Sequence, residues 1–220
     1  MNGSDDEKAM RTGAAQTLYS YWNDVRAGRL APRRFDIEPA RITALLPDTF
    51  ILERTHDADL RYRLAGTRIC EQFGSEFRGR SFFEGWSGAD RASIEACTSR
   101  VIHDGGVALL TLEVRTATDR DVAALEMLLL PLTHTRGSID RVLGIIAPLA
   151  GTAQHLLLPF TSRRLAANEI IWPEGRPHRL ADVIGRQSPF PAHIRRARIV
   201  RADRRQFRVY DGGLSGGERE

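Results

Sequence analysis

The 220-residue sequence lacks several features that would assign it to a common class of protein. It has no run of about 18 apolar residues and no apolar stretch at its polar N-terminus, so it predicts neither a membrane-spanning helix nor a signal peptide. The two cysteines, Cys70 and Cys97, form neither a disulfide framework nor a metal-ligand cluster. Their scarcity favours a reducing, cytoplasmic setting and predicts no metal site. The motifs of phosphate loops and dinucleotide sites are absent, and no nucleophile, base and orienting group can be assembled, which predicts a protein without enzymatic activity.

Lysine is almost absent, since Lys8 is the only one, and nearly every positive charge is therefore an arginine. The net charge of +4 is unevenly spread, because residues 176–210 contain ten arginines against Asp182 and Asp203. A basic tail can bind nucleic acid, an acidic protein or an anionic surface. No nucleic-acid-binding motif accompanies it, so a disordered or partner-docking tail is preferred. Its central arginines are Arg195, Arg196, Arg198, Arg201, Arg204, Arg205 and Arg208.

The spacing of apolar residues predicts an α+β fold. Leu18, Trp22 and Val25 recur at helical spacing and predict an amphipathic helix over residues 16–26. A second helix is expected over residues 90–103, with Ser87 and Asp90 resembling a capping box at its start. Apolar residues that recur with a period of two, or in short runs bounded by turns, predict strands over residues 49–54, 60–65, 107–116, 122–131 and 141–148. This order gives a five-stranded antiparallel sheet with short helices on one face.

The same features divide the chain into five parts. These are a disordered N-terminus (1–13), an N-terminal helix with a connecting segment (14–47), a core domain (48–150), a C-terminal extension (151–175) and the basic tail (176–220).

Several short motifs follow one another in a specific order. They are Trp22 and residues 30–33, 36–39, 46–47, 61–67, 73–74, 79–80 and 126–132. On these motifs, residues 16–165 resemble the PAS_5 type of PAS domain, which occurs in small stand-alone bacterial regulatory proteins. The resemblance implies a PAS fold and a role in signal transduction through contacts with proteins such as sensor histidine kinases. It supplies no known cofactor: none bound covalently is expected, and a small organic ligand in the PAS pocket stays open.

Candidate pocket residues follow from the strand faces and from the aromatic segment after the second strand. They are Tyr62, Phe73, Phe82, Phe83, Trp86, Leu110, Leu112, Glu126 and Leu128. A buried Glu126 would need a partner, which Arg63 or Arg68 could supply. Together with Arg80, these arginines are the candidate polar anchors for a ligand. The alternative, which is preferred, is an ordinary packed core with an ion pair at its rim.

Further alternatives concern cofactors and assembly. His103 ends the second helix, where it could ligate haem, but the helix dipole also favours a histidine there. Cys70 departs from the Asn-Cys-Arg-Phe setting of flavin photochemistry, so both cysteines are interpreted as small buried apolar side chains. The stripe of Leu18, Trp22 and Val25 fits two roles equally well, as a cover for the sheet or as the seam of a homodimer.

Overall fold

The computed structural model describes residues 3–55, 59–116, 122–134, 137–149 and 159–173. The chain divides into two units, Met1–Ala181 and Asp182–Glu220, and all described residues lie in the first. The helices are α1 (Gly3–Ala9), α2 (Gly13–Arg26), the 3-10 helices η1 (Arg34–Asp36) and η2 (Pro39–Asp48), α3 (Thr67–Phe73) and α4 (Gly88–Asp104). The strands are β1 (Thr49–Arg54), β2 (Leu60–Ala65), β3 (Val107–Thr116), β4 (Val122–Thr133), β5 (Ile139–Pro148) and β6 (Phe160–Ile171). Of the helices in these ranges, none is both long and apolar enough to cross a membrane.

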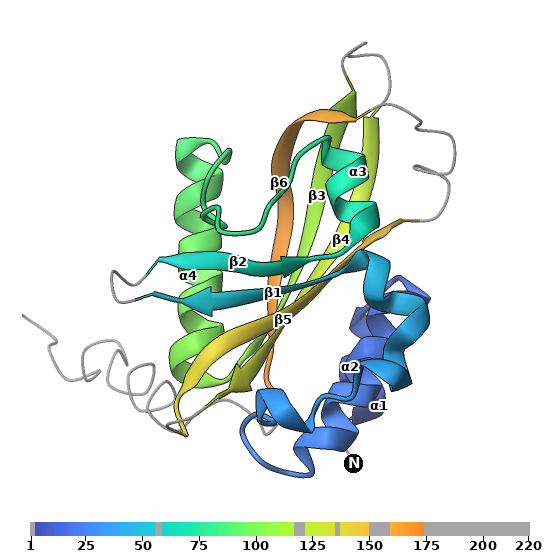
Figure 1. The fold of residues 1–220 in the computed structure, drawn as a ribbon, viewed down its shortest axis with the longest axis vertical. Helices are drawn as coiled ribbons and strands as arrows, with labels where there is room; N and C mark the ends of the chain where they lie inside the picture. Colours follow the sequence, from blue (N-terminus) through green and yellow to red (C-terminus); the bar gives the residue numbers. More distant parts are fainter. Residues whose placement is uncertain (1–2, 56–58, 117–121, 135–136, 150–158, 174–220) are drawn as a thin grey trace, which may run out of the picture. The chain divides into compact units, whose positions relative to one another are not determined.

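Six strands form one antiparallel sheet in the order β2-β1-β5-β4-β3-β6 (Figure 1). The prediction of five strands is therefore wrong by one. The additional strand, β6, pairs with β3 along almost its whole length and forms one edge of the sheet. Most of its side chains are exposed or half-buried, so the segment lacks the regular alternation that reveals a strand in a sequence.

Each face of the sheet carries its own apolar core, and Figure 1 shows α4 and α2 on opposite sides. The α4 face is covered by α3, α4 and the segment 74–87, whereas the α2 face is covered by α1, α2 and η2. Helices thus lie on both faces rather than on one. The period of two in β3 sends Leu110 and Leu112 to the α4 face and Leu109 to the α2 face.

The start of the chain, which the sequence predicts to be disordered, contains helix α1. Met10 is fully buried, and the Tyr19 hydroxyl donates a hydrogen bond to Asp6 over 2.9 Å. Thr12 is the N-cap residue of helix α2, and its Oγ1 accepts the backbone N–H of Ala15. Ala27 is the C-cap residue and adopts a left-handed conformation with φ of 48°.

Helix α4 begins without the predicted capping box. Ser87 is the N-cap residue, but its side chain makes no capping hydrogen bond. The Asp90 carboxylate instead accepts the backbone N–H of Leu165 at 3.2 Å. Asp90 therefore ties the first turn of α4 to the edge strand β6.

A β-bulge in the β1–β2 hairpin changes the face on which Leu64 lies. Ile51 pairs with Leu64, but the next residue, Leu52, pairs with Tyr62, so Arg63 has no residue opposite it. Tyr62 consequently points to the α4 face, while Leu64 lies with Ile51 on the α2 face. Simple alternation predicts Tyr62 and Leu64 on one face, and that prediction is wrong: Leu64 is 47% exposed.

Candidate functional site

Seven of the nine predicted pocket residues gather on the α4 face. Tyr62, Phe82, Phe83, Trp86, Leu110 and Leu112 belong to its buried core, and Phe73 packs against it. The rings contact one another directly: the Tyr62 ring centroid lies 4.9 Å from that of Phe77 and 5.8 Å from that of Phe82. We name this cluster the aromatic core. These ring contacts match the preferred interpretation of the segment as a packed core, and a small cavity of about 170 Å³ borders it at Phe73 and Phe77.

Arg163 of β6, which the sequence analysis missed, closes the aromatic core at its edge. Its guanidinium carbon lies 4.3 Å from the ring centre of Trp86 and 5.9 Å from that of Phe73. The guanidinium also donates to the carbonyl oxygen of Glu84 and interacts electrostatically with the Tyr62 hydroxyl. Only recognition of β6 as a strand could have indicated this position.

Burial controls the protonation of this pair. It raises the pKa of Tyr62 to about 12, although the positive charge of Arg163 acts in the opposite direction. Burial also lowers the pKa of Arg163, against the favourable influence of Tyr62. The contact therefore joins a neutral phenol to a cation, and neither group changes its protonation near neutral pH.

Glu126 and Leu128, the remaining two predicted pocket residues, lie on the opposite, α2 face. Glu126 is 2% exposed and holds the junction between α1 and α2. Its carboxylate accepts the backbone N–H of Arg11 at 2.8 Å, the backbone N–H of Thr12 at 2.9 Å and the Thr12 hydroxyl at 2.5 Å. Glu126 therefore anchors the N-terminal segment to the sheet, far from the aromatic core.

The three predicted polar anchors do not converge on one site. Their ion-pair partners are Glu53 for Arg63, Asp48 for Arg68 and Glu84 for Arg80. The prediction that Arg63 or Arg68 pairs with Glu126 is therefore wrong. All three arginines are exposed, so the ion pairs of Arg63 and Arg80 contribute little to stability, whereas the Asp48 partner of Arg68 is buried.

The stripe on α2 packs against the sheet. Leu18 and Trp22 are fully buried, and Nε1 of Trp22 donates to the carbonyl oxygen of Pro131 at 2.9 Å. Val25 is partly buried against the same core. Of the two roles left open by the sequence, these contacts match the cover for the sheet. A dimer seam on these side chains would require α2 to leave the sheet.

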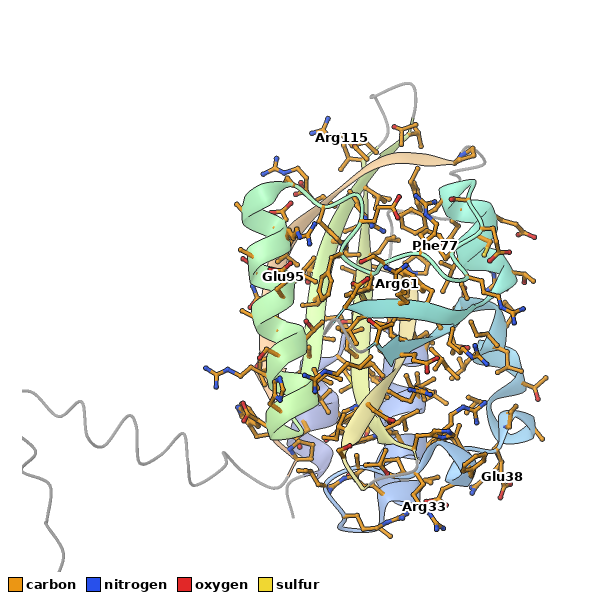
Figure 2. The ribbon with its side chains drawn as sticks, turned by 60° about the vertical axis from the view of Figure 1, so that its left-hand side comes forward. Arg33, Glu38, Arg61, Phe77, Glu95 and Arg115 are labelled. Carbon is orange, nitrogen blue, oxygen red and sulfur yellow. The ribbon has the colours of Figure 1, made fainter. Side chains whose placement is uncertain are left out.

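A charged cavity of about 850 Å³ lies between α4 and β2. Figure 2 labels Arg61 on β2 and Glu95 on α4, which line its two sides. The cavity is lined largely by ion pairs: Arg61 with Asp59, Arg80 with Glu84 and Arg91 with Glu95. The exposed His103 lies at its rim.

A second opening is mainly apolar and lies between η2 and the β1–β2 hairpin. We name it the η2 groove. It has a volume of about 390 Å³, and Ile42, Leu46, Ile51 and Leu64 contribute to its walls. It adjoins a hollow of about 680 Å³, with which it shares Ile51 and Leu64.

Comparison with known proteins identifies the family. The model of the PAS_5 family, described as a PAS domain, matches residues 10–147, which is more than half of the chain. The chain belongs to the PAS_5 family. A search of the curated proteins finds no match. Among solved structures, that of an RsLOV variant matches with 17% sequence identity and a TM-score of 0.39, over 51% of this chain and 68% of that one.

PAS domains are general signalling and sensory modules, and this one has an addition beyond the matched residues. The match ends at residue 147, whereas β6 (Phe160–Ile171) follows it. The strand that extends the sheet, and with it the Arg163 side chain over the aromatic core, therefore comes from outside the matched segment.

Both cysteines lie among apolar side chains. Cys97 is buried, which raises the pKa of its thiol, and Cys70 is half-buried against the aromatic core. Both contacts fit the interpretation as small apolar side chains. Within the ranges that the structure describes, no three His, Cys, Asp or Glu residues gather in a way that could hold a metal. The basic tail, residues 176–220, lies outside those ranges, so its role stays a prediction.

Proposed function

We propose that this PAS domain is a non-enzymatic regulator that acts through contacts with partner proteins such as sensor histidine kinases. The observation that carries the proposal is the aromatic core. The residues expected to line a ligand pocket contact one another instead, with ring centroids 4.9 to 6.1 Å apart in the cluster around Tyr62 and Phe82. A signal would then enter and leave through the surface of the domain.

The segment 74–87 supports a route from that surface to the aromatic core. Its backbone pairs with the outer edge of β2: the Phe82 N–H donates to Leu60 over 2.7 Å, and the Tyr62 N–H donates to Arg80 over 3.0 Å. The same segment carries Phe82 and Trp86 into the core. A partner that bound one arrangement of this segment more tightly would shift the population toward it.

A second function, the sensing of a small polar molecule, is supported by the charged cavity between α4 and β2. Four arginines and three carboxylates line this cavity: Arg54, Arg61, Arg80, Arg91, Asp59, Glu84 and Glu95. Such a lining suits a ligand that carries charges of both signs. It does not suit haem, which needs an apolar slot beside its ligand, although His103 lies at the rim.

Two measurements on the full-length protein separate these functions. Native mass spectrometry of freshly purified protein is expected to give the bare mass of the chain, while a mass excess that disappears on denaturation would favour the ligand sensor. The second measurement is the autophosphorylation of purified sensor kinases from the source organism, with and without the protein. We expect the rate for at least one kinase to change about fivefold or more. If every kinase is unaffected, the proposed regulatory role is wrong.

A further inference from the structure

We propose that the η2 groove and the arginines beside it bind an acidic, amphipathic helix of a partner protein. This inference rests on the proposed function, whose partner it describes by chemistry.

The floor of the η2 groove exposes apolar side chains to solvent. Of the four large apolar side chains that are exposed in the described ranges, Leu64, 47% exposed, lines the groove, and Phe35, 73% exposed, lines the adjoining hollow. Leu64 is exposed because the bulge at Arg63 turns it away from the aromatic core. Exposed apolar side chains that gather in one groove are typical of an interaction site.

The rim of the groove is positively charged. The charged side chains of the adjoining hollow are Arg34, Arg63, Arg78, Arg141 and Glu76. Arg63 and Arg141 share one carboxylate, Glu53, at 3.8 and 2.8 Å, and Arg141 also lies 3.7 Å from the carboxylate of Asp140. Among the described contacts, Arg34 and Arg78 have no ion-pair partner. This excess of guanidinium groups favours a partner that carries carboxylates.

His134 adds a polar group to the same hollow. Its ring lies 5.1 Å from that of Phe35, and its Nδ1 is buried without a hydrogen-bond partner in the described part of the chain. A buried polar atom without a partner costs free energy. A partner that moved the exposed Phe35 ring could place a polar group against this nitrogen.

The positive charge of the rim disfavours two occupants of the groove that this protein could itself supply: a second copy of the domain and the basic tail. In a two-fold symmetric dimer built on this surface, the arginines of one copy would face those of the other. The basic tail carries ten arginines against two aspartates in residues 176–210, so it has the same sign of charge as the rim. An acidic partner remains, and a groove with apolar walls fits the apolar ridge of a helix.

Binding of a defined peptide to the full-length protein tests the proposal. The probe is a fluorescein-labelled peptide of about four helical turns, with leucine at helical spacing and glutamate elsewhere. A second peptide carries glutamine in place of glutamate. We expect the acidic peptide to bind about tenfold more tightly than the glutamine peptide at low salt, and the difference to shrink at high salt.

Variants locate the site. Leu64→Ser, at a position already half exposed, is expected to weaken binding about tenfold through lost apolar contact. The double variant Arg34→Glu with Arg78→Glu is expected to weaken it by a similar factor. The matched control is Arg164→Glu, an exposed arginine on β6 at the opposite edge of the sheet, which should leave affinity unchanged. Circular dichroism checks that each variant is folded.

Several outcomes would overturn the proposal. These are equal affinity for the two peptides, no effect of Leu64→Ser, or an equal loss in the Arg164→Glu control. Binding of phosphatidylserine vesicles but not of the peptide would assign the surface to a membrane instead. The kinase assay separates the two proposals: if the Arg34→Glu, Arg78→Glu variant regulates a kinase as well as the natural protein does, the surface is wrong and the function stands. If the natural protein regulates none, the function itself fails.

Discussion

The two faces of the sheet belong to the same strands but differ in their side chains and in the elements that cover them. Aromatic side chains dominate the α4 face: Phe50, Tyr62, Phe77, Phe82, Phe83, Trp86 and Phe160. On the α2 face the apolar side chains that the strands contribute are all aliphatic, including Leu109, Leu128, Leu130 and Ile145. Helices α1, α2 and η2 cover this second face, and a buried carboxylate docks the N-terminus of α2.

This difference separates an anchoring face from a responsive one. On the α2 face, Trp22 and Glu126 bond to fixed backbone groups, which holds α2 in one position. On the α4 face, part of the cover is the non-helical segment 74–87, held at the edge of β2 by a few backbone hydrogen bonds. Segments of this kind open at a lower free-energy cost than packed helices. We therefore expect conformational signals to involve the α4 face and stability to depend on the α2 face.

The largest effect is expected from breaking the anchor of the α2 face. Glu126→Ala removes three hydrogen-bond acceptor contacts and leaves the part-buried N–H of Arg11 and the buried donors of Thr12 without this partner. We expect a loss of about 3 kcal/mol in the free energy of unfolding, measured by urea titration at neutral pH.

The matched control for Glu126 lies on the neighbouring strand. Glu113 is also a glutamate in the sheet but is exposed, so Glu113→Ala should change stability by less than about 0.5 kcal/mol. Equal losses in both variants would mean that apolar packing alone docks α2.

The next largest loss of stability is expected from a substitution that disturbs the tight packing of the aromatic core. Gly144 lies opposite Phe50, and a Cβ at this position would lie 2.1 Å from Cζ of the Phe50 ring. Gly144→Ala must therefore displace a buried ring, and we expect it to cost about 2 kcal/mol of stability. Gly13→Ala is the control, because nothing lies within 4 Å of its added Cβ. A loss in Gly144→Ala no larger than in Gly13→Ala would show that the aromatic core adjusts freely.

Sequence reasoning succeeded where periodicity and burial agree. The bounds of β1, β2 and β3 were predicted to the residue, because turns and alternation mark them clearly. Membership of the PAS_5 family, inferred from motifs in order, is confirmed by the family match over residues 10–147. Gly66, in one of those motifs, has a structural reason: a Cβ there would lie 2.2 Å from the carbonyl oxygen of Pro47.

The features that the sequence did not predict are those that depend on tertiary contacts. The bulge that exposes Leu64 depends on pairing with β1, which alternation within β2 does not contain. The hydrogen-bond partners of Glu126 are mainly backbone N–H groups of a distant segment, so no residue type could indicate them. Arg163 stayed hidden because β6 exposes most of its side chains. The aromatic core was recognised as a set of residues, and the preferred interpretation as ordinary packing matches the ring contacts.

A smaller effect on stability is expected at alkaline pH, and it can be compared for a buried tyrosine on each face. Burial raises the pKa of Tyr62, on the α4 face, to about 12, and it also raises the pKa of Tyr19, on the α2 face. Between pH about 10 and 12 the unfolded phenol loses its proton while the folded Tyr62 keeps it, so stability falls as pH rises. The expected loss for Tyr62 at pH 11 is about 1 kcal/mol.

Urea titrations at about pH 9 and pH 11 measure this loss. Tyr62→Phe should remove the contribution of the α4 face, and Tyr19→Phe that of the α2 face. If the pH dependence survives both substitutions, other groups cause it and the burial argument is wrong.

The smallest effect concerns the end of α2 and should leave the aromatic core untouched. Among the described residues, Ala27 is the one non-glycine residue with positive φ, at 48°. Because a Cβ disfavours this conformation, Ala27→Gly is expected to raise the free energy of unfolding by about 0.5 kcal/mol. The opposite sign is expected for Ala92→Gly, at an exposed position inside α4, which should lose about 1 kcal/mol. Thermal unfolding of the two variants checks both signs, and a loss in Ala27→Gly would mean that the left-handed turn at Ala27 carries no strain.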